Sequence, residues 1–232
     1  PNTRLVAVMH ASNVCGTLLP IKEIGDICRE RGLPLILDAA QTAGHYPVDM
    51  KELGLSAVCA PGHKGLLGPQ GIGVLMLEEG FAKRVEPLIA GGTGSASDSE
   101  LLPPYMPDRF ESGTLNIPGI FGLNAALGFI LDKGVPALRA HEERLTSRFI
   151  AGLEGLPLRL AGTKDIGRRV GVVSIDFTGH DNAEIAYELD KRGIMTRCGL
   201  HCAPSAHRTL GTFPQGTVRF SMGYANAECD VD

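Results

Sequence analysis

The sequence predicts an α/β protein in which a mostly parallel sheet is flanked by helices and followed by a smaller C-terminal α+β domain. Short apolar runs of strand length recur in the first half of the chain, and stretches with helical periodicity lie between or after them. The composition agrees, because 44% of the 232 residues are hydrophobic and 21% are charged. Strands that alternate with helices favour a parallel sheet with right-handed crossovers.

The first half of the chain contains most of the predicted strands. One strand each is predicted for residues 5–9, 33–37, 56–60 and 71–77. These runs are short and bounded by polar residues, Gly or Pro, which is typical of strands buried in a parallel sheet. Between the first two runs, residues 20–31 place apolar side chains on one face of a helix, and Gly32 follows as a stop signal. This order predicts a large domain over residues 1–135.

A second unit is predicted after a long loop and two helices. Residues 91–116 are rich in Gly, Ser, Pro and Asp, and long ordered loops are often functional. Residues 117–134 and 137–153 have helical periodicity, and we assign residues 136–155 as a connecting helix. Further strands are predicted at residues 170–177, 194–197 and 217–221, with a helix at 181–192 that has Asp181 near its N-cap. Together these elements predict a small α+β domain over residues 156–232.

The charge and composition argue against several classes of protein. The net charge is −4, Lys and Arg form no block, and no apolar run reaches the ~20 residues of a membrane span, so we expect no nucleic-acid partner and no membrane association. The first residues do not form a signal-peptide pattern. The six cysteines are spread through a chain long enough to build a core, which favours a reducing, cytoplasmic compartment over a disulfide framework.

Three polar clusters directly follow predicted strands. They are His10-Ala11-Ser12-Asn13, Asp38-Ala39-Ala40-Gln41 and Gly62-His63-Lys64-Gly65. Ligands of parallel α/β sheets bind at the carboxyl ends of strands, so we expect folding to bring these clusters to one rim. An acid, a lysine and an amide on one rim suit a pyridine-aldehyde cofactor. The Lys64 amine would form a Schiff base with the aldehyde, and the Asp38 carboxylate would keep the ring nitrogen protonated.

Four motifs, in this order, resemble a known family. They are Asp38-x-x-Gln41, Gly62-His63-Lys64, Arg109-Phe110-Glu111-Ser112-Gly113-Thr114 and Arg197-Cys198-Gly199-Leu200-His201-Cys202. Together they resemble the class V aminotransferase-fold (fold type I) enzymes, and most of all the cysteine desulfurases and selenocysteine lyases. The resemblance covers nearly the whole chain. It implies pyridoxal 5'-phosphate as cofactor, L-cysteine or a related amino acid as substrate, a homodimer, and a sulfur-acceptor protein that serves iron–sulfur cluster assembly.

The resemblance assigns the cofactor-binding residues. Lys64 would be the Schiff-base lysine, and its released amine would remove the substrate α-proton. Asp38 would pair with the pyridinium nitrogen. Gln41 and Asn13 would reach the phenolic oxygen, and His63 would lie near the phosphate.

Four further positions match residues that act on the substrate or on a partner subunit. Thr114 matches the residue that reaches across the dimer interface to the partner's phosphate. Arg219 matches the arginine that holds the substrate carboxylate bidentately, and Arg197 is a second substrate-binding candidate. Cys202 matches the cysteine that attacks the substrate sulfur and keeps it as a persulfide while alanine leaves. A positive charge on His201 or Arg197 would lower the pKa of that thiol.

Two departures from the family pattern concern the cofactor. Many relatives carry Ser or Thr two residues before the histidine, where the hydroxyl contacts phosphate, but this chain has Pro61 there, without a hydroxyl or an N–H. The upstream third of the family's large domain is absent from this sequence, and it normally supplies a ring-stacking residue and a phosphate loop. We therefore expect the large domain to be incomplete at its N-terminus. An apolar run begins almost directly after Pro1 and a helix is just beginning at residues 227–232, so we expect sequence to be missing on both sides.

Simpler interpretations of the same residues stay open. Lys64 alone could be a solvated surface lysine, and Asp38 alone could be a helix N-cap. Cys198 and Cys202 lie near two histidines, but structural zinc sites usually show four ligands in paired short spacings, so no metal site is predicted. Cys202 could also be an inert loop cysteine. The other four cysteines are expected to be buried small apolar residues, and they are Cys15, Cys28, Cys59 and Cys229.

The leading hypothesis is therefore a cytoplasmic, homodimeric cysteine desulfurase that forms a persulfide on Cys202. Its rivals on the same fold are a selenocysteine lyase, a cysteine-sulfinate lyase and an aminotransferase. Outside the enzymes, the alternative is a cofactor-free fragment or scaffold.

Overall fold

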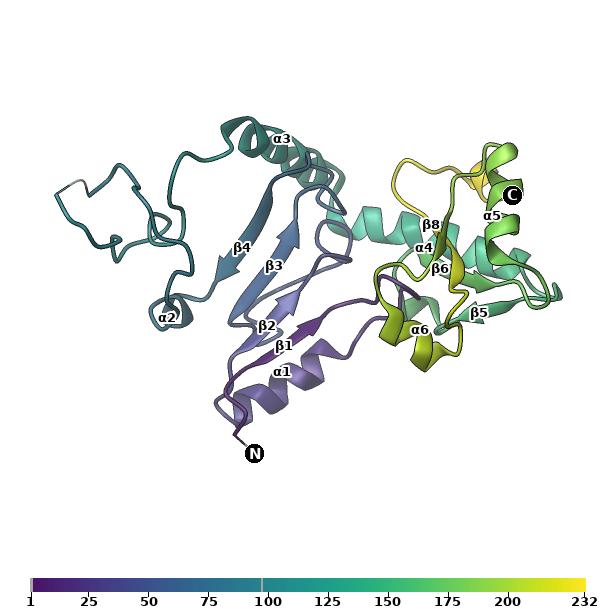
Figure 1. The fold of residues 1–232 in the computed structure, drawn as a ribbon, viewed down its shortest axis with the longest axis horizontal. Helices are drawn as coiled ribbons and strands as arrows, with labels where there is room; N and C mark the ends of the chain where they lie inside the picture. The colour runs from purple at the N-terminus through teal and green to yellow at the C-terminus, as the bar shows by residue number, and fades with distance from the viewer. Residues whose placement is uncertain (1, 97) are drawn as a thin grey trace. The chain divides into compact units, whose positions relative to one another are not determined.

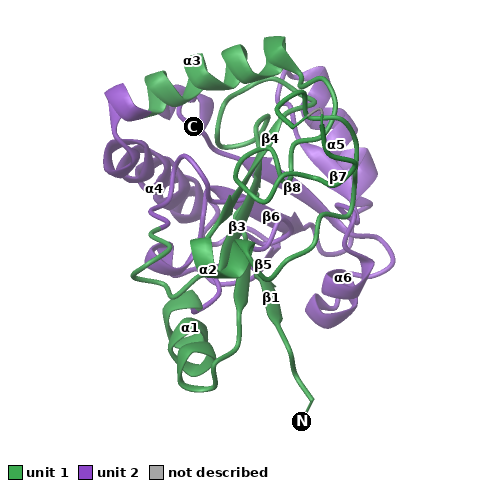
Figure 2. Cartoon of the chain, turned by 90° about the vertical axis from the view of Figure 1, so that its left-hand side faces the viewer, with its two compact units in different colours: residues 1–8, 21–40, 49–130 green, residues 9–20, 41–48, 131–232 purple. Residues whose placement is uncertain are grey.

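The computed structural model describes residues 2–96 and 98–232 (Figure 1). The chain divides into two compact units, which Figure 2 shows in different colours. Unit 1 comprises Pro1–Val8, Ile21–Ala40 and Asp49–Ile130, and unit 2 comprises Met9–Pro20, Gln41–Val48 and Leu131–Asp232. The units are interleaved along the sequence because two short segments, residues 9–20 and 41–48, leave the first half of the chain to join unit 2. The domain boundaries at residues 135 and 156 stay a prediction.

The sheet of unit 1 has four strands in the order β1-β2-β3-β4. These strands are β1 (Val6–Met9), β2 (Leu35–Asp38), β3 (Ala57–Pro61) and β4 (Gly73–Leu77). The arrows of β1, β2 and β3 point the same way in Figure 1, and β4 runs antiparallel to β3. Leu35 and Leu37 of β2 are fully buried. The predicted α/β class is confirmed, and all four predicted strands are found.

Three helices accompany this sheet: α1 (Ile21–Glu30), α2 (Glu79–Ala82) and α3 (Ile117–Lys133). Helix α1 buries Ile21, Gly25 and Cys28, which recur at helical spacing on one face. Gly25 allows a close approach, because a Cβ at this position would lie 2.0 Å from the Leu53 carbonyl oxygen. The helices predicted at residues 20–31 and 117–134 are therefore confirmed with small shifts at their ends.

Unit 2 is an α+β unit with an antiparallel sheet of order β5-β6-β8-β7. The strands are β5 (Arg159–Ala161), β6 (Val172–Asp176), β7 (Arg197–Gly199) and β8 (Thr217–Ser221). The helices are α4 (Val135–Gly152), α5 (Asn182–Lys191), α6 (Pro204–Leu210) and the short 3₁₀ turns η1 (Ile166–Arg168) and η2 (Glu228–Asp230). The side chain of Asp181 caps α5 by accepting from Ala183 N at 2.7 Å, as predicted. Val173 and Ile175 of β6 form a core with Ile150 of α4.

Some expected elements of unit 2 were wrong or missed. The strand predicted at residues 194–197 does not form, and β7 begins only at Arg197. Ile194 and Met195 are apolar but exposed, because they belong to the segment that leads from the left-handed Gly193 into the sheet. Helix α6 was not predicted although it carries end signals, with Pro204 at its start and the left-handed Gly211 at its C-cap.

All six cysteines are free thiols. Cys15 and Cys28 are buried, as predicted. The same prediction is wrong for Cys229, which is exposed on η2, and Cys59 is only half-buried. Among the described residues, no single helix is long and apolar enough to cross a membrane. Helices α3 and α4, which are bent by 78° relative to each other, would together be long and apolar enough.

Candidate functional site

Lys64 lies on the turn that leaves the carboxyl end of β3. The Gly68 amide donates to the Gly62 carbonyl at 2.7 Å and closes this turn. Gly62 has no room for a side chain, because a Cβ would lie 2.7 Å from the Ile72 side chain. The turn leaves the side chains of Lys64 and His63 exposed. No hydrogen bond or ion pair joins the Lys64 amine to a described residue, so the amine is available to a ligand.

Asp38 ends β2, the strand that pairs in parallel with β3. Its exposed carboxylate accepts a hydrogen bond from the Ala40 amide at 2.8 Å, which orients the side chain at the strand end. Burial, assisted by the Asp38 charge, raises the pKa of the Cys59 thiol on β3. An acid and a free primary amine therefore follow the carboxyl ends of two adjacent parallel strands, at one edge of the sheet.

Two further cofactor candidates of unit 1 are exposed. His63 precedes Lys64 on the same turn, and Pro61, the position that is Ser or Thr in many relatives, ends β3. Thr114 lies in the predicted long loop, which has no helix or strand in its described part. The Gly113 amide donates to the Gly92 carbonyl at 2.8 Å and so joins the two ends of the loop. The inter-subunit role of Thr114 stays a prediction.

Cys202 is an exposed thiol on a sharp turn between β7 and α6 of unit 2. His201 and Cys202 have φ angles of 48° and 61°, the left-handed region that side chains other than glycine rarely adopt. The Ala203 amide donates to the Leu200 carbonyl at 2.8 Å across this turn. The Asn13 side-chain amide donates to the His201 carbonyl at 2.7 Å. These contacts hold the turn in a strained shape that presents the Cys202 thiol to solvent.

His201 points in the opposite direction, into the protein. It is buried, and its Nε2 lies 3.0 Å from the Thr217 hydroxyl. Burial, followed by the charge of Arg219, lowers the pKa of His201 to about 4. The imidazole is therefore neutral near pH 7, and the expectation that a positive His201 activates the Cys202 thiol was wrong.

The positive charge of this region comes from arginines instead. Arg197 and Arg219 are directly paired across β7 and β8, so both side chains leave the same face of the sheet. Arg219 Nη1 donates to the Asn13 carbonyl at 2.9 Å, whereas its Nε is buried without a partner among the described residues. Burial and the nearby Arg197 charge lower the pKa of Arg219, and Cys202 acts in the opposite direction. The Arg219 guanidinium therefore keeps an N–H without a hydrogen-bond partner near the Cys202 thiol, and such a group suits an anionic part of a ligand.

Asn13 and Gln41 belong to unit 2. Asn13 joins the Cys202 turn to Arg219, because its side chain donates to the His201 carbonyl and its own carbonyl accepts from Arg219. Gln41 is half-buried and directly precedes Thr42, whose hydroxyl lies 3.0 Å from His10 Nδ1. Their contact with a phenolic oxygen stays a prediction.

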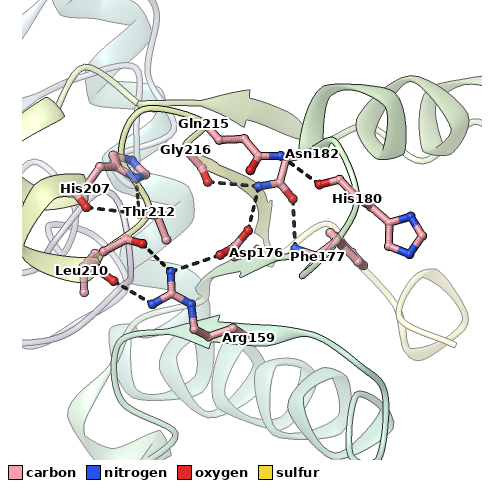
Figure 3. Close-up of polar contacts among 11 residues, drawn as sticks. Arg159, Asp176, Phe177, His180, Asn182, His207, Leu210, Thr212, Gln215 and Gly216 are labelled. Atoms are coloured by element: carbon pink, nitrogen blue, oxygen red, sulfur yellow. Dashed lines mark hydrogen bonds and ion pairs between the residues drawn. The ribbon is translucent and has the colours of Figure 1, made fainter.

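The sequence did not reveal a polar network, centred on the buried Asn182, that supports the segment after Cys202 (Figure 3). Asn182 is fully buried, accepts from the Phe177 amide at 3.0 Å and donates to the Gly216 carbonyl at 3.1 Å. Arg159 donates to the Leu210 and Gly211 carbonyls, both at 2.9 Å, at the end of α6. Asp176 accepts from both Asn182 and Arg159, at 3.2 and 3.1 Å. The sequence does not indicate that an Asn directly after a helix N-cap will be buried and bind backbone groups, since most Asn residues are exposed.

Several known proteins that are similar to this chain in sequence or in structure are described as cysteine desulfurases. A protein of Pyrococcus abyssi described as a probable cysteine desulfurase is 37% identical over 232 residues, which are 99% of this chain and 57% of the relative. The apo structure of a cysteine desulfurase from Thermococcus onnurineus superposes with a TM-score of 0.92 at 37% identity, over 98% of this chain and 57% of that chain.

A second structure, the cysteine desulfurase CsdA (S-sulfonic acid) from Escherichia coli, gives a TM-score of 0.85 at 27% identity, over 98% of this chain and 56% of that chain. The chain thus spans a little more than half the length of these relatives. The model of the family Aminotransferase class-V matches residues 1–232, the whole chain. The chain belongs to the aminotransferase class-V family.

Proposed function

We propose that this chain is part of a pyridoxal-phosphate-dependent cysteine desulfurase, which removes sulfur from L-cysteine and holds it as a persulfide on Cys202. The observation that carries the proposal is the exposed Cys202 thiol on a strained turn beside Arg219. The relatives described as cysteine desulfurases support it, and the family to which the chain belongs depends on pyridoxal phosphate.

The residues of unit 1 fit such a cofactor. Lys64 offers an exposed amine without a described partner, and Asp38 offers an exposed carboxylate at the end of the neighbouring strand. When bound, the cofactor accepts the electrons released at the substrate α-carbon. Lys64 would hold the cofactor and then remove the α-proton, while Asp38 would keep a proton on the ring nitrogen. His63 and Thr114 are the side chains of unit 1 that we assign to the phosphate. Gln41 and Asn13, which belong to unit 2, are assigned to the phenolic oxygen.

The residues of unit 2 fit an amino-acid substrate with a sulfur atom. Arg219 would bind the substrate carboxylate through the fork whose Nε is unpaired, and Arg197 would add a second positive charge. The Cys202 thiolate would attack the substrate sulfur, which forms the new S–S bond as the C–S bond breaks. The electron pair of the broken bond remains on the carbon skeleton, which leaves as alanine after protonation.

A visible spectrum tests the cofactor assignment. The purified protein that carries this chain, with pyridoxal phosphate added, should absorb in the near-visible range, and Lys64→Ala should lose that band. Lys51→Ala is a matched control, because Lys51 is an exposed lysine of the same unit outside the site. A colourless wild-type protein that added cofactor does not change would contradict the proposal and favour the cofactor-free scaffold.

The sulfur-transfer step requires a separate test. In Cys202→Ser the cofactor band should remain, while alanine formation from L-cysteine should fall by about 10²-fold or more because the nucleophile is absent. Mass spectrometry should detect an added sulfur on Cys202 in the wild type after incubation with L-cysteine. Full turnover of Cys202→Ser would rule out the persulfide route and favour a lyase or an aminotransferase on the same fold.

Assembly and location follow as part of the same proposal. We expect a homodimer in which Thr114 reaches the partner's cofactor, a sulfur-acceptor protein that takes the persulfide sulfur, and a reducing, cytoplasmic environment that keeps the six thiols free. A single-species sedimentation measurement at dimer mass would support the first of these expectations.

A further inference from the structure

Two buried histidines lie behind the Cys202 turn and contact each other. The rings of His201 and His207 have centroids 5.4 Å apart and are tilted by 48°. His201 is 5% exposed and His207 is fully buried. Both belong to the same unit as the turn, and His201 directly precedes the exposed Cys202.

Each ring is held by one threonine hydroxyl. His207 Nδ1 lies 2.7 Å from the Thr212 hydroxyl, a contact drawn in Figure 3, and His201 Nε2 lies 3.0 Å from the Thr217 hydroxyl. The second nitrogen of each ring, His201 Nδ1 and His207 Nε2, is buried without a partner among the described residues. One imidazole nitrogen of a neutral ring is a donor and the other an acceptor, so neither ring needs a charge to keep its threonine contact.

The surroundings disfavour a proton on either ring. Burial first, and then the charges of Arg219 on β8, His207 on α6 and Arg197 on β7, lower the pKa of His201 to about 4, against a hydrogen bond with Thr217 that raises it. Burial also lowers the pKa of His207. An added proton on His201 would occupy the buried Nδ1, which has no partner among the described residues, beside two arginines.

The backbone connects this pair to the thiol. His207 lies on α6, and its amide donates to the Ala203 carbonyl at 3.2 Å, directly after Cys202. Its carbonyl accepts from the Thr212 amide at 2.9 Å. The Arg159 and Asn182 contacts in Figure 3 fix the far end of this segment at Leu210, Gly211 and Gly216. His207 is thus the side chain through which a rigid segment supports the His201 ring.

We propose that His207 is a positioning residue for Cys202: as a neutral imidazole bonded to Thr212, it packs against the His201 ring and so keeps His201 and Cys202 in the left-handed turn that presents the thiol. The inference deepens the proposed function, which gives Cys202 the sulfur. It concerns only the shape of the turn, so it can fail while cysteine desulfurase activity stands, and it can hold in a protein with another activity.

The direct test measures the sign of φ at His201 and Cys202 by NMR coupling constants, in the protein that carries this chain. Wild type at pH 7.5 should show positive φ at both residues. His207→Ala removes the ring and the Thr212 contact, so both residues should average toward negative φ. His207→Phe keeps a ring against His201 and should retain positive φ. His10→Ala is the matched control, because His10 is also a buried histidine bonded to a threonine of unit 2, and it should leave the turn unchanged.

Thiol labelling gives a second readout in the same samples. An uncharged disulfide reagent should label Cys202 and the exposed Cys229, and peptide mass spectrometry gives their ratio, with Cys229 as the internal standard. The Cys202 to Cys229 ratio should fall about fivefold in His207→Ala, the effect of a small loss of conformational preference. If the ratio and both φ signs in His207→Ala equal those of wild type, His207 does not position the thiol.

Acidification tests the same pair without relying on the alanine variant, which could fail to fold. In wild type, positive φ should persist from pH 7.5 to about pH 5 and be lost as the pH falls through about 4, where His201 takes up a proton. A charge on His207 lowers the pKa of His201, and His207→Phe removes that charge, so its transition should move to higher pH. Identical transitions in wild type and His207→Phe would overturn the proposal, whether or not the protein turns over L-cysteine.

Discussion

At the scale of single residues, buried polar side chains that bind backbone groups determine much of unit 2. Asn182 and Arg169 are both almost fully buried, and each satisfies several backbone groups. A buried backbone group that loses its partner costs far more than an average hydrogen bond contributes, so these positions are sensitive to substitution.

Asn182→Ala should destabilise the protein by about 3 kcal/mol, because it leaves the Phe177 amide and the Gly216 carbonyl buried and unpaired. Urea unfolding followed by circular dichroism measures the change. Gln215→Ala is the control, since Gln215 is exposed and makes one hydrogen bond to the His180 carbonyl, and it should change stability by less than about 0.5 kcal/mol. Equal losses in the two variants would refute this account of Asn182.

Arg169→Lys should destabilise the protein by about 2 kcal/mol although the charge is kept. The Arg169 guanidinium donates to the carbonyls of Thr163, Cys15 and Val172, and a lysine amine cannot reach three carbonyls in that fork. Burial also lowers the pKa of Arg169, and among the described residues no carboxylate offsets that cost. Arg168→Lys, an exposed neighbour, should leave the urea midpoint unchanged, and a stable Arg169→Lys would show that the fork is dispensable.

At the scale of elements, close packing can reverse the usual stabilising effect of a Gly→Ala substitution in a helix. Glycine inside a helix is less favourable than alanine by roughly 1 kcal/mol, so Gly→Ala ordinarily stabilises a helix. Helix α1 is an exception, because Gly25 touches the Leu53 carbonyl, whereas Gly128 of α3 faces open space.

The two substitutions should therefore have opposite signs. Gly128→Ala should raise stability by about 0.5 to 1 kcal/mol through helix propensity. Gly25→Ala should lower stability by about 2 kcal/mol, because its Cβ would lie 2.0 Å from the Leu53 oxygen and must push backbone apart. Thermal melts of both variants against wild type decide the matter, and a more stable Gly25→Ala would mean that α1 moves freely away from Leu53.

At the scale of the whole molecule, stability should depend on pH through histidines that are buried and neutral. Burial lowers the pKa of His10 and of His201 to about 4 from an ordinary 6.5. The unfolded chain then binds protons that the folded chain refuses, so this contribution to stability is complete above pH 6.5 and is lost as the pH falls toward 4.

Each of the two histidines should account for about 3 kcal/mol of this loss. Urea unfolding at pH 7.5 and pH 4.5 should show the difference, and His10→Gln, which cannot titrate, should reduce it by about the share of one histidine. A His10→Gln protein with the wild-type pH dependence would place the proton uptake elsewhere.

The sequence by itself determined the class of the fold and the order of its elements. Apolar runs followed by Asp38 and by Gly62-His63-Lys64 predicted two strand ends, and the structure places both at one edge of a parallel pair, because strand periodicity and Gly or Pro boundaries are local properties of the chain. The exposed Cys202 and its paired arginines were also named in advance, through motifs that lie close together in sequence or match a family.

Only the tertiary structure decided which polar residues are buried and what they contact. It showed that His201 is buried and neutral, that Asn13 joins the Cys202 turn to Arg219, that Asn182 binds the Gly216 carbonyl, and that the His207 ring lies against the His201 ring. The apolar residues 194–195, which predicted a strand, proved to be exposed. The physical reason is that burial and contacts between residues far apart in sequence, such as Asn13 and Arg219, arise from packing and leave no periodic pattern in the sequence.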